Sequence, residues 1–123
     1  MVRVLTIRPV NSIVFISGGG FVDVPADQLQ RTSLFAASRD CLIVCVYPEV
    51  DGPTKLTIGG AREVDPGYTP SFVGILETRS GRIIIDQVDD HVVHDQAVEN
   101  STVTVTLWFS DSRWPEQVFI GID

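Results

Sequence analysis

The stretch Thr102–Phe109 constrains the fold of this chain more than any other. Every second residue in it is large and apolar: Val103, Val105, Leu107 and Phe109. Because successive side chains of a strand point to opposite faces of a sheet, these four share one face, and the threonines share the other with Trp108. A helix would scatter both sets around its circumference. The stretch therefore predicts a β-strand with one face in the core.

Further short apolar or alternating segments are separated by residues that favour turns. We expect strands at Val2–Arg8, Ser12–Ile16, Phe21–Val24, Cys41–Tyr47, Thr54–Ile58, Phe72–Thr78, Arg82–Val88 and Val118–Ile122. Pro25–Leu29 is the best helical candidate, and Gln30–Asp40 fits either a short strand or a helical turn. This pattern predicts an all-β fold, an antiparallel β-sandwich of about eight strands with a jelly roll as one arrangement. A chain of 123 residues suits one domain, residues 1–123.

Glycine-containing turns suggest how some strands are joined. Asp51-Gly52 predicts a hairpin between Cys41–Tyr47 and Thr54–Ile58, because Asp-Gly is a strong hairpin signal. Arg79-Ser80-Gly81 predicts a second hairpin between the strands on either side of it. The run Ser17–Gly20 predicts a tight turn and not a phosphate-binding loop, because the spacing of such a loop is missing.

Two other segments are expected to lack regular structure. Ala61–Ser71 contains two prolines and a glycine, and predicts a loop that crosses between sheets or passes around an edge. Asp89–Asn100 is polar and acidic, and predicts a second loop.

The chain is acidic, with 16 acidic and 9 basic residues and a net charge of −7. Nucleic acids and anionic membranes attract positive surfaces, so we expect neither as a partner. The charge suits a basic partner, or serves solubility alone. No stretch approaches the ~20 apolar residues of a membrane-spanning helix, and the first residues lack the apolar run of a signal peptide. We therefore expect a cytoplasmic protein.

The two cysteines are expected to be free thiols in a buried strand. On a strand, Cys41 and Cys45 would lie about 13 Å apart at ~3.3 Å per residue, which is too far for a disulfide. The segment Cys41–Tyr47 is apolar at odd and even positions, which predicts a central strand buried on both faces. Unpaired thiols also fit a reducing compartment.

The segment Asp86–Asp95 is the candidate for a metal site. It contains both histidines, and Asp90, His91 and His94 could supply ligands for zinc or calcium. On a strand, however, the two histidines point to opposite faces, and the β-branched pair Val92-Val93 disfavours a helix. We expect a solvated acidic loop, no cofactor and no catalysis. A small-molecule-binding or metal-dependent enzyme that uses this segment is the alternative.

Three aromatic residues near the end of the chain are the candidate binding surface. If Thr102–Phe109 and Val118–Ile122 form a hairpin, Phe119 lies beside Trp108, and Trp114 lies in the joining loop. Such aromatic residues are enriched in interface hot spots. The open alternative is that a second sheet, or Gln30–Asp40, covers Trp108 and Phe119. If they are exposed and the last strand is a sheet edge, a homodimer through this face is expected.

The part of the chain after Phe72 also resembles a known family. The segments Gly74–Gly81 and Trp114–Ile120, with the strand through Trp108, are similar to small bacterial β-sandwich proteins of the competence-protein-J-like type. The resemblance implies a β-sandwich that binds a protein, in one known role by inhibiting a nuclease. We therefore expect a non-catalytic binding protein whose partner is a protein or a second copy of this chain.

Overall fold

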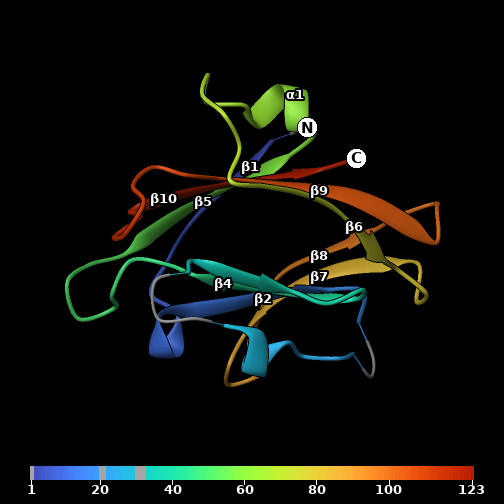
Figure 1. Ribbon diagram of the computed structural model, residues 1–123, viewed down its shortest axis with the longest axis horizontal. Helices are drawn as coiled ribbons and strands as arrows, with labels where there is room; N and C mark the ends of the chain where they lie inside the picture. The colour runs from blue at the N-terminus through green and yellow to red at the C-terminus, as the bar shows by residue number, and fades with distance from the viewer. Residues whose placement is uncertain (1, 20–21, 30–32) are drawn as a thin grey trace.

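The computed structural model describes residues 2–19, 22–29 and 33–123, and it consists of two five-stranded sheets that face each other (Figure 1). Sheet A has the order β1 (Arg3–Ile7), β5 (Thr54–Gly59), β10 (Gln117–Ile122), β9 (Thr102–Phe109) and β6 (Phe72–Glu77). Sheet B has the order β3 (Phe35–Ala37), β4 (Cys41–Cys45), β2 (Ile13–Ser17), β7 (Arg82–Gln87) and β8 (Val92–Ala97). Strands β5 and β10 are parallel, whereas the other pairs in the described residues are antiparallel. The predicted β-sandwich is confirmed.

The alternation in β9 fixes how sheet A faces the core. The four large apolar side chains of the stretch are buried, and Val118, Ile120 and Ile122 of β10 join them. Strands β9 and β10 form the predicted hairpin, with Phe119 opposite Trp108 in the register. The fully buried core residues of both sheets pack between the two layers: Val14, Ile16, Leu42, Val44, Leu56, Ile58, Leu76, Ile83, Ile85, Val105, Leu107, Val118 and Ile120.

Strand β4 is buried on both faces, as predicted. Leu42 and Val44 face the core between the sheets, whereas Cys41 and Ile43 are buried on the other face. That outer side of sheet B carries the 3-10 helix η2 (Ala26–Gln28), drawn in light blue in Figure 1. The helix predicted at Pro25–Leu29 is therefore one 3-10 turn.

Both edges of the sandwich are linked by side chains from facing strands. The rings of Phe35 in β3 and Phe72 in β6 lie 5.3 Å apart, centroid to centroid. At the opposite edge, the Arg3 guanidinium in β1 donates to Nδ1 of His94 in β8 at 3.0 Å. Sheet A therefore contacts sheet B at β6 and β3 on one side and at β1 and β8 on the other.

The two hairpins predicted from glycine turns are wrong. Strands β4 and β5 lie in different sheets, as do β6 and β7, so the turns at Gly52 and Gly81 are crossings between sheets. Turn residues allow the chain to reverse, but they do not determine whether the next strand pairs with the previous one or with a strand of the facing sheet.

The predictions for the less regular segments are corrected in several places. The acidic segment Asp89–Asn100 contains β8, which pairs with β7 at the edge of sheet B. Residues 22–24 form no strand, and the start of the predicted strand Phe21–Val24 lies outside the described residues. In Gln30–Asp40, residues 30–32 lie outside the described residues, and β3 fulfils the short-strand alternative.

The segment predicted as a loop at Ala61–Ser71 begins with a helical turn, α1 (Ala61–Val64). The Glu63 carboxylate accepts a hydrogen bond from the Gly60 N–H at 3.3 Å, which is half of a capping box. Helix α1 and the chain after it lie on the outer side of sheet A (Figure 1). A second 3-10 turn, η1 (Val10–Ser12), joins β1 to β2. Among the described residues, no helix is long and apolar enough to cross a membrane.

The predicted turn after β2 begins with a glycine that is tightly enclosed by backbone. A Cβ atom on Gly18 would lie 2.4 Å from the carbonyl oxygen of Glu77 and 3.0 Å from the Cα of Thr78. The Gly18 carbonyl also accepts a hydrogen bond from the Ser80 hydroxyl. Gly19 has a positive φ of 81°, and Gly20 lies outside the described residues. The end of β2 is therefore packed directly against the crossing from β6 to β7.

We expect Gly18→Ala to lower the free energy of unfolding by about 1–3 kcal/mol, because the neighbouring backbone must move to admit a methyl group. Urea denaturation measures the change. Ser101→Ala, at an exposed position on the same end of the sandwich, should change the value by less than ~0.5 kcal/mol. Equal stability of Gly18→Ala and the natural protein would contradict this close contact.

Candidate binding site

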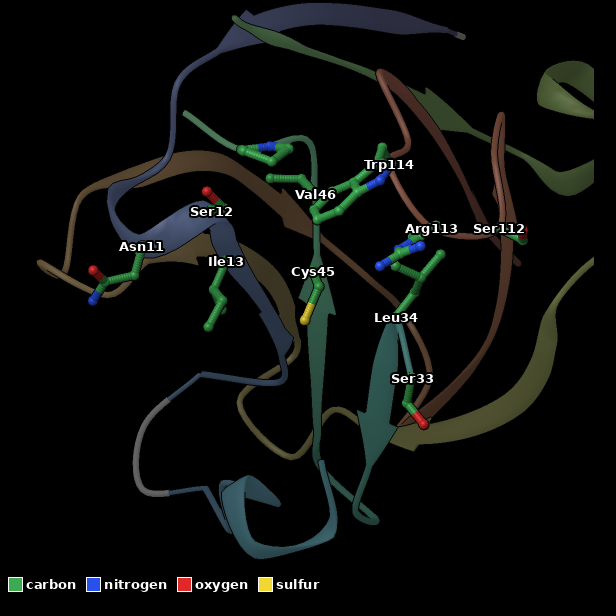
Figure 2. A pocket seen from close by; sticks show the side chains of 11 residues that line it. Asn11, Ser12, Ile13, Ser33, Leu34, Cys45, Val46, Ser112, Arg113 and Trp114 are labelled. Atoms are coloured by element: carbon green, nitrogen blue, oxygen red, sulfur yellow. The ribbon is translucent and has the colours of Figure 1, made fainter. Parts of the chain in front are cut away.

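A pocket of about 1010 Å³ opens at the end of the sandwich where β4 ends and β2 begins (Figure 2). Much of its lining is apolar: Ile13, Leu34, Cys45, Val46, Pro48 and Trp114. The lining residues come from β2, from the approach to β3, from β4 and from the loop between β9 and β10. Its volume is at the upper end of the range typical of ligand-binding clefts. The pocket is thus a concave candidate site in the described part of the chain.

The loop 110–116 holds Trp114 at the rim of this pocket. The Asp111 carboxylate accepts hydrogen bonds from the backbone N–H of Trp114 at 2.6 Å and of Arg113 at 3.0 Å. These bonds lower the pKa of the Asp111 carboxyl, and the bond from Trp114 has the larger effect. At the base of the loop, the Ser110 N–H donates to the Gln117 carbonyl, and the Gln117 N–H donates to the Ser110 hydroxyl oxygen, each at 3.0 Å. Trp114 is 53% exposed, so an exposed tryptophan is held on an ordered loop.

Arg113 also contributes to this rim. Its guanidinium carbon lies 5.4 Å from the centroid of the Trp114 ring, within the range of a cation–π contact. A positive charge therefore lies at the mouth of the pocket, next to the exposed aromatic ring.

The loops around the pocket carry most of their charge as carboxylates. Strands β1, β4, β7 and β9 all end at this side of the sandwich, which brings residues 8–12, 46–53, 88–91 and 110–116 together. These loops contain two arginines, Arg8 and Arg113, and six acidic residues: Glu49, Asp51, Asp89, Asp90, Asp111 and Glu116. The pocket therefore has an acidic surround.

Two contacts show how closely these loops approach one another. Burial raises the pKa of Tyr47, and the carboxylates of Glu116 and Asp51 raise it further, so both acids lie near the phenol. The Glu49 carboxylate accepts a hydrogen bond from the Asn11 N–H at 3.3 Å, which connects loop 46–53 to loop 8–12.

The structure separates the three aromatic residues predicted to form a binding surface. Trp108 is only 3% exposed, and its indole N–H donates to the Tyr68 carbonyl at 2.9 Å. Phe119 is half-buried opposite it. The interpretation of Trp108 as an exposed residue is wrong. The alternative is correct in that Trp108 is covered, but the chain after α1, which carries Tyr68 and contacts Trp108, is a cover that the sequence did not suggest.

The same observation removes the basis for a dimer through the Trp108 face. Strand β10 lies between β5 and β9, so it is not an edge strand. A second copy cannot contact Trp108 unless the segment that carries Tyr68 moves away.

The metal-site candidates in Asp86–Asp95 are distributed over a strand end, a turn and a strand. His91 is exposed in the turn, where its N–H donates to the Asp89 carboxylate at 3.2 Å. His94 is buried in β8. Because a guanidinium can only donate, the bond from Arg3 makes Nδ1 of His94 an acceptor, and Nε2–H donates to Gln96 at 2.9 Å. The two histidines therefore point to different surroundings.

The carboxylates of this segment do not complete a ligand set with the histidines. Asp86 lies at a bulge between β7 and β8. Burial raises its pKa, and the charge of Asp90 raises it further. Within residues 2–19, 22–29 and 33–123, no group of three or more His, Cys, Asp and Glu side chains could hold a metal ion.

The absence of a tightly bound metal remains a prediction. We expect elemental analysis of protein purified without chelator to find zinc and calcium far below one equivalent, because His91 and His94 do not converge. Near-stoichiometric zinc that disappears in the His91→Ala/His94→Ala variant would contradict the prediction.

Both cysteines are free, as predicted, but their surroundings differ. Cys41 is fully buried, and burial, together with the nearby carboxylate of Asp40, raises its pKa to about 12. Cys45 is half-buried at the pocket, and burial raises its pKa also. The expectation that both thiols are buried is therefore correct for Cys41 and too strong for Cys45.

We expect a thiol reagent at pH 8 to modify Cys45 slowly and Cys41 only when the protein unfolds, because the reactive species is the thiolate. The rate of modification of each cysteine can be followed by mass spectrometry of peptides, with Cys41→Ser and Cys45→Ser variants as references. Modification of Cys41 in the folded protein at the rate of Cys45 would be inconsistent with its burial.

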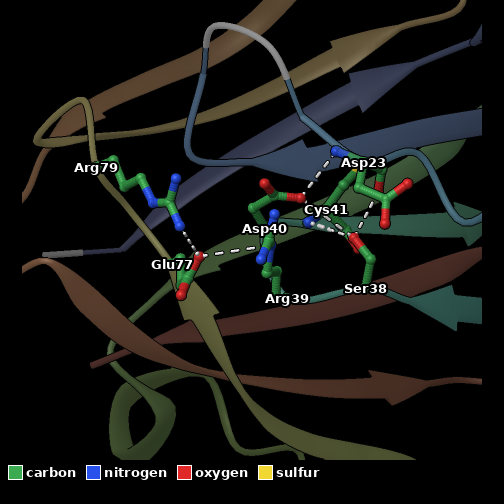
Figure 3. A network of polar contacts seen from close by, with 7 residues as sticks. All are labelled: Asp23, Ser38, Arg39, Asp40, Cys41, Glu77 and Arg79. Carbon is green, nitrogen blue, oxygen red and sulfur yellow. Dashed lines mark hydrogen bonds and ion pairs between the residues drawn. The ribbon is translucent and has the colours of Figure 1, made fainter.

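A network of polar contacts at the opposite end of the sandwich holds neighbouring segments of the chain together (Figure 3). The Asp23 N–H donates to the Asp40 carboxylate at 2.9 Å, and the Ser38 hydroxyl donates to the Asp23 carbonyl. Glu77 pairs with Arg79 at 3.2 Å and with Arg39 at 3.9 Å. These contacts attach the chain after β2 and the end of β6 to the turn between β3 and β4.

Sequence reasoning placed Trp114 in a loop but missed the pocket beside it. The lining residues are far apart in the chain, and no short motif contains them. The one local signal is Asp111, whose carboxylate can accept from the backbone of residues two and three positions later.

No family model and no curated protein matches this chain. Among solved structures, it is similar to ComJ from Bacillus subtilis, described as an inhibitor of the DNA-degrading activity of NucA, with a TM-score of 0.63 and 10% sequence identity. The match covers 99% of this chain and 97% of ComJ. A second structure, described as crocagin biosynthetic gene J, has a TM-score of 0.47 at 8% identity over 98% of this chain and 94% of the other.

The resemblance inferred from the residues after Phe72 is therefore confirmed at the level of the fold, and it extends over almost the whole chain. At 10% identity the likeness concerns the fold alone. The chain adopts the β-sandwich fold of ComJ.

Proposed function

We propose that the protein is a non-catalytic, cytoplasmic binding protein that acts on a protein partner as an inhibitor does, and that the pocket beside Trp114 is its binding site. The observation that carries the proposal is the exposed Trp114, held by Asp111 at the rim of a largely apolar pocket. Interface hot spots are enriched in tryptophan next to pockets from which water is excluded.

Three further features support this proposal. The fold is shared with ComJ, which is described as an inhibitor of another protein's activity. The acidic surface disfavours nucleic acid as a direct ligand. The buried Cys41, with its raised pKa, has the character of a structural thiol and not of a nucleophile.

The proposal is tested by crosslinking followed by measurement of affinity. A photoreactive amino acid is placed at Ser112 in the pocket loop and, as a control, at Glu99 on an exposed turn at the other end. We expect a protein to be captured from the source cell from position 112 and not from position 99. The captured protein is then purified, and its affinity for the natural chain and for Trp114→Ala is measured.

We expect Trp114→Ala to weaken this binding by about 30-fold or more, which corresponds to the ~2 kcal/mol of a hot-spot residue. Circular dichroism establishes that the variant is folded, as expected for an exposed side chain. Equal capture from both positions, or an unchanged affinity in Trp114→Ala, would refute the proposal. Sedimentation of the protein alone determines whether a second copy of the chain is the partner.

A further inference from the structure

We infer that the occupant of the pocket is a basic protein surface that inserts an uncharged, apolar side chain beside Trp114. The inference rests on the function proposed above and adds the chemistry of the partner. It commits to one arrangement, in which cationic side chains of the partner meet the acidic loops while one apolar side chain enters the pocket.

The first argument is the net negative charge of the loops around the pocket. The four loops at the pocket end contain six acidic and two basic residues. The other end of the sandwich is acidic as well, but two of its arginines, Arg39 and Arg79, pair with Glu77 in β6. The carboxylates around the pocket favour a positively charged partner at this site.

The second argument concerns how these carboxylates are held. Asp51 and Glu116 both raise the pKa of Tyr47, so the two charges lie on one small area beside the pocket. Pro48, from the same loop as Asp51, lines the pocket itself. A cation bound near Tyr47 therefore lies within a Debye length, ~8–10 Å, of more than one carboxylate.

The third argument concerns the side chain that enters the pocket. Arg113 lines the pocket and lies over the Trp114 ring. Its charge repels a lysine or arginine that would approach the same ring, whereas Ile13, Leu34 and Val46 offer apolar contacts. The geometry thus separates two kinds of contact, with cations on the acidic loops and an apolar side chain in the pocket.

The probe for the test is a synthetic peptide of about twelve residues in which lysines flank a single phenylalanine, a length that spans an interface pocket and its rim. Three reference peptides have glutamates in place of the lysines, serine in place of the phenylalanine, and lysine in place of the phenylalanine. Binding to the full chain is measured by calorimetry at low and at high salt.

We expect saturable binding of the lysine–phenylalanine peptide that weakens by about tenfold between ~50 and ~300 mM salt, as an electrostatically assisted complex should. The glutamate peptide should not bind, and both peptides that lack the phenylalanine should bind several-fold more weakly. Asp51→Asn/Glu116→Gln should weaken binding several-fold. The matched variant Asp27→Asn/Glu99→Gln, with both changes at exposed positions away from the pocket, should bind as the natural chain does.

Several outcomes would overturn the inference: no saturable binding at millimolar peptide, equal binding of the serine peptide, or equal losses in the two double variants. The captured protein partner separates this failure from that of the proposed function. If Trp114→Ala abolishes capture, while neither salt nor Asp51→Asn/Glu116→Gln affects affinity, the proposed binding site is supported. The inference that the partner is basic is then refuted. If Trp114→Ala changes nothing, both proposals fail.

Discussion

Trp108→Ala is expected to lower the free energy of unfolding by about 3–5 kcal/mol, the range for removal of a buried large aromatic side chain. Trp108 is 3% exposed and lies opposite Phe119 across the β9–β10 hairpin. Its replacement by alanine opens a cavity under the chain that follows α1, and it removes the donor that the Tyr68 carbonyl now accepts from. Urea denaturation should show a lower midpoint at an unchanged slope.

Two further variants of Trp108 distinguish burial from a role in an interface. Trp108→Phe keeps an aromatic ring but loses the hydrogen bond to Tyr68, so a smaller loss of about 1–2 kcal/mol is expected. Trp108→Glu should unfold the protein, because an unpaired charge would be buried. If Trp108→Glu instead remains folded, while sedimentation shows that the natural protein is a dimer and the variant a monomer, Trp108 is an interface residue in solution.

The elements predicted correctly are those in which a local pattern decides the outcome. Strict alternation in Thr102–Phe109 fixes which side chains face the core, and once β9 pairs with β10 it restricts the register to one that keeps Val118 and Ile120 on the same face. In Cys41–Tyr47 the apolar residues at both odd and even positions correctly indicated that the strand is buried on both faces. In both cases the periodicity of side chains along a strand carries the information.

The elements predicted incorrectly depend on contacts between distant segments. Strand β8 has a polar sequence because it lies at a sheet edge, where His94 meets Arg3 and much of the strand is exposed. The cover over Trp108 comes from a proline- and glycine-containing segment whose position over sheet A has no local signal. Whether a turn closes a hairpin or crosses between sheets depends likewise on the packing of the whole sandwich.

The candidate site was likewise predictable only where a local pattern decides the outcome. Trp114 was predicted to lie in the loop that joins the last two strands, and the structure places it there, with its side chain exposed. The pocket could not be predicted, because its walls combine residues near the start of β2 and β3, at the end of β4 and in loop 110–116. The acidic residues around it were visible as a composition, but the meeting of these loops around the pocket follows only from the directions of the strands.

A pair of adjacent residues in β6 offers a direct test of the sheet register. Leu76 is 1% exposed and packs in the core opposite Val103, whereas Ile75 is 68% exposed opposite Thr104. We expect Leu76→Ala to lower the free energy of unfolding by about 2–5 kcal/mol, because it leaves a cavity between the sheets. Ile75→Ala should change it by less than ~0.5 kcal/mol, because its side chain is already in solvent.

The contrast between these two variants is informative because β6 is an edge strand, held in sheet A by β9 alone. A shift of one residue in the pairing would exchange the two side chains, with Ile75 in the core and Leu76 in solvent. Denaturation of both variants in one series therefore distinguishes the registers by the order of the two losses. Equal and substantial losses would instead mean that another surface covers Ile75 in solution, which concentration-dependent stability of the natural protein would reveal.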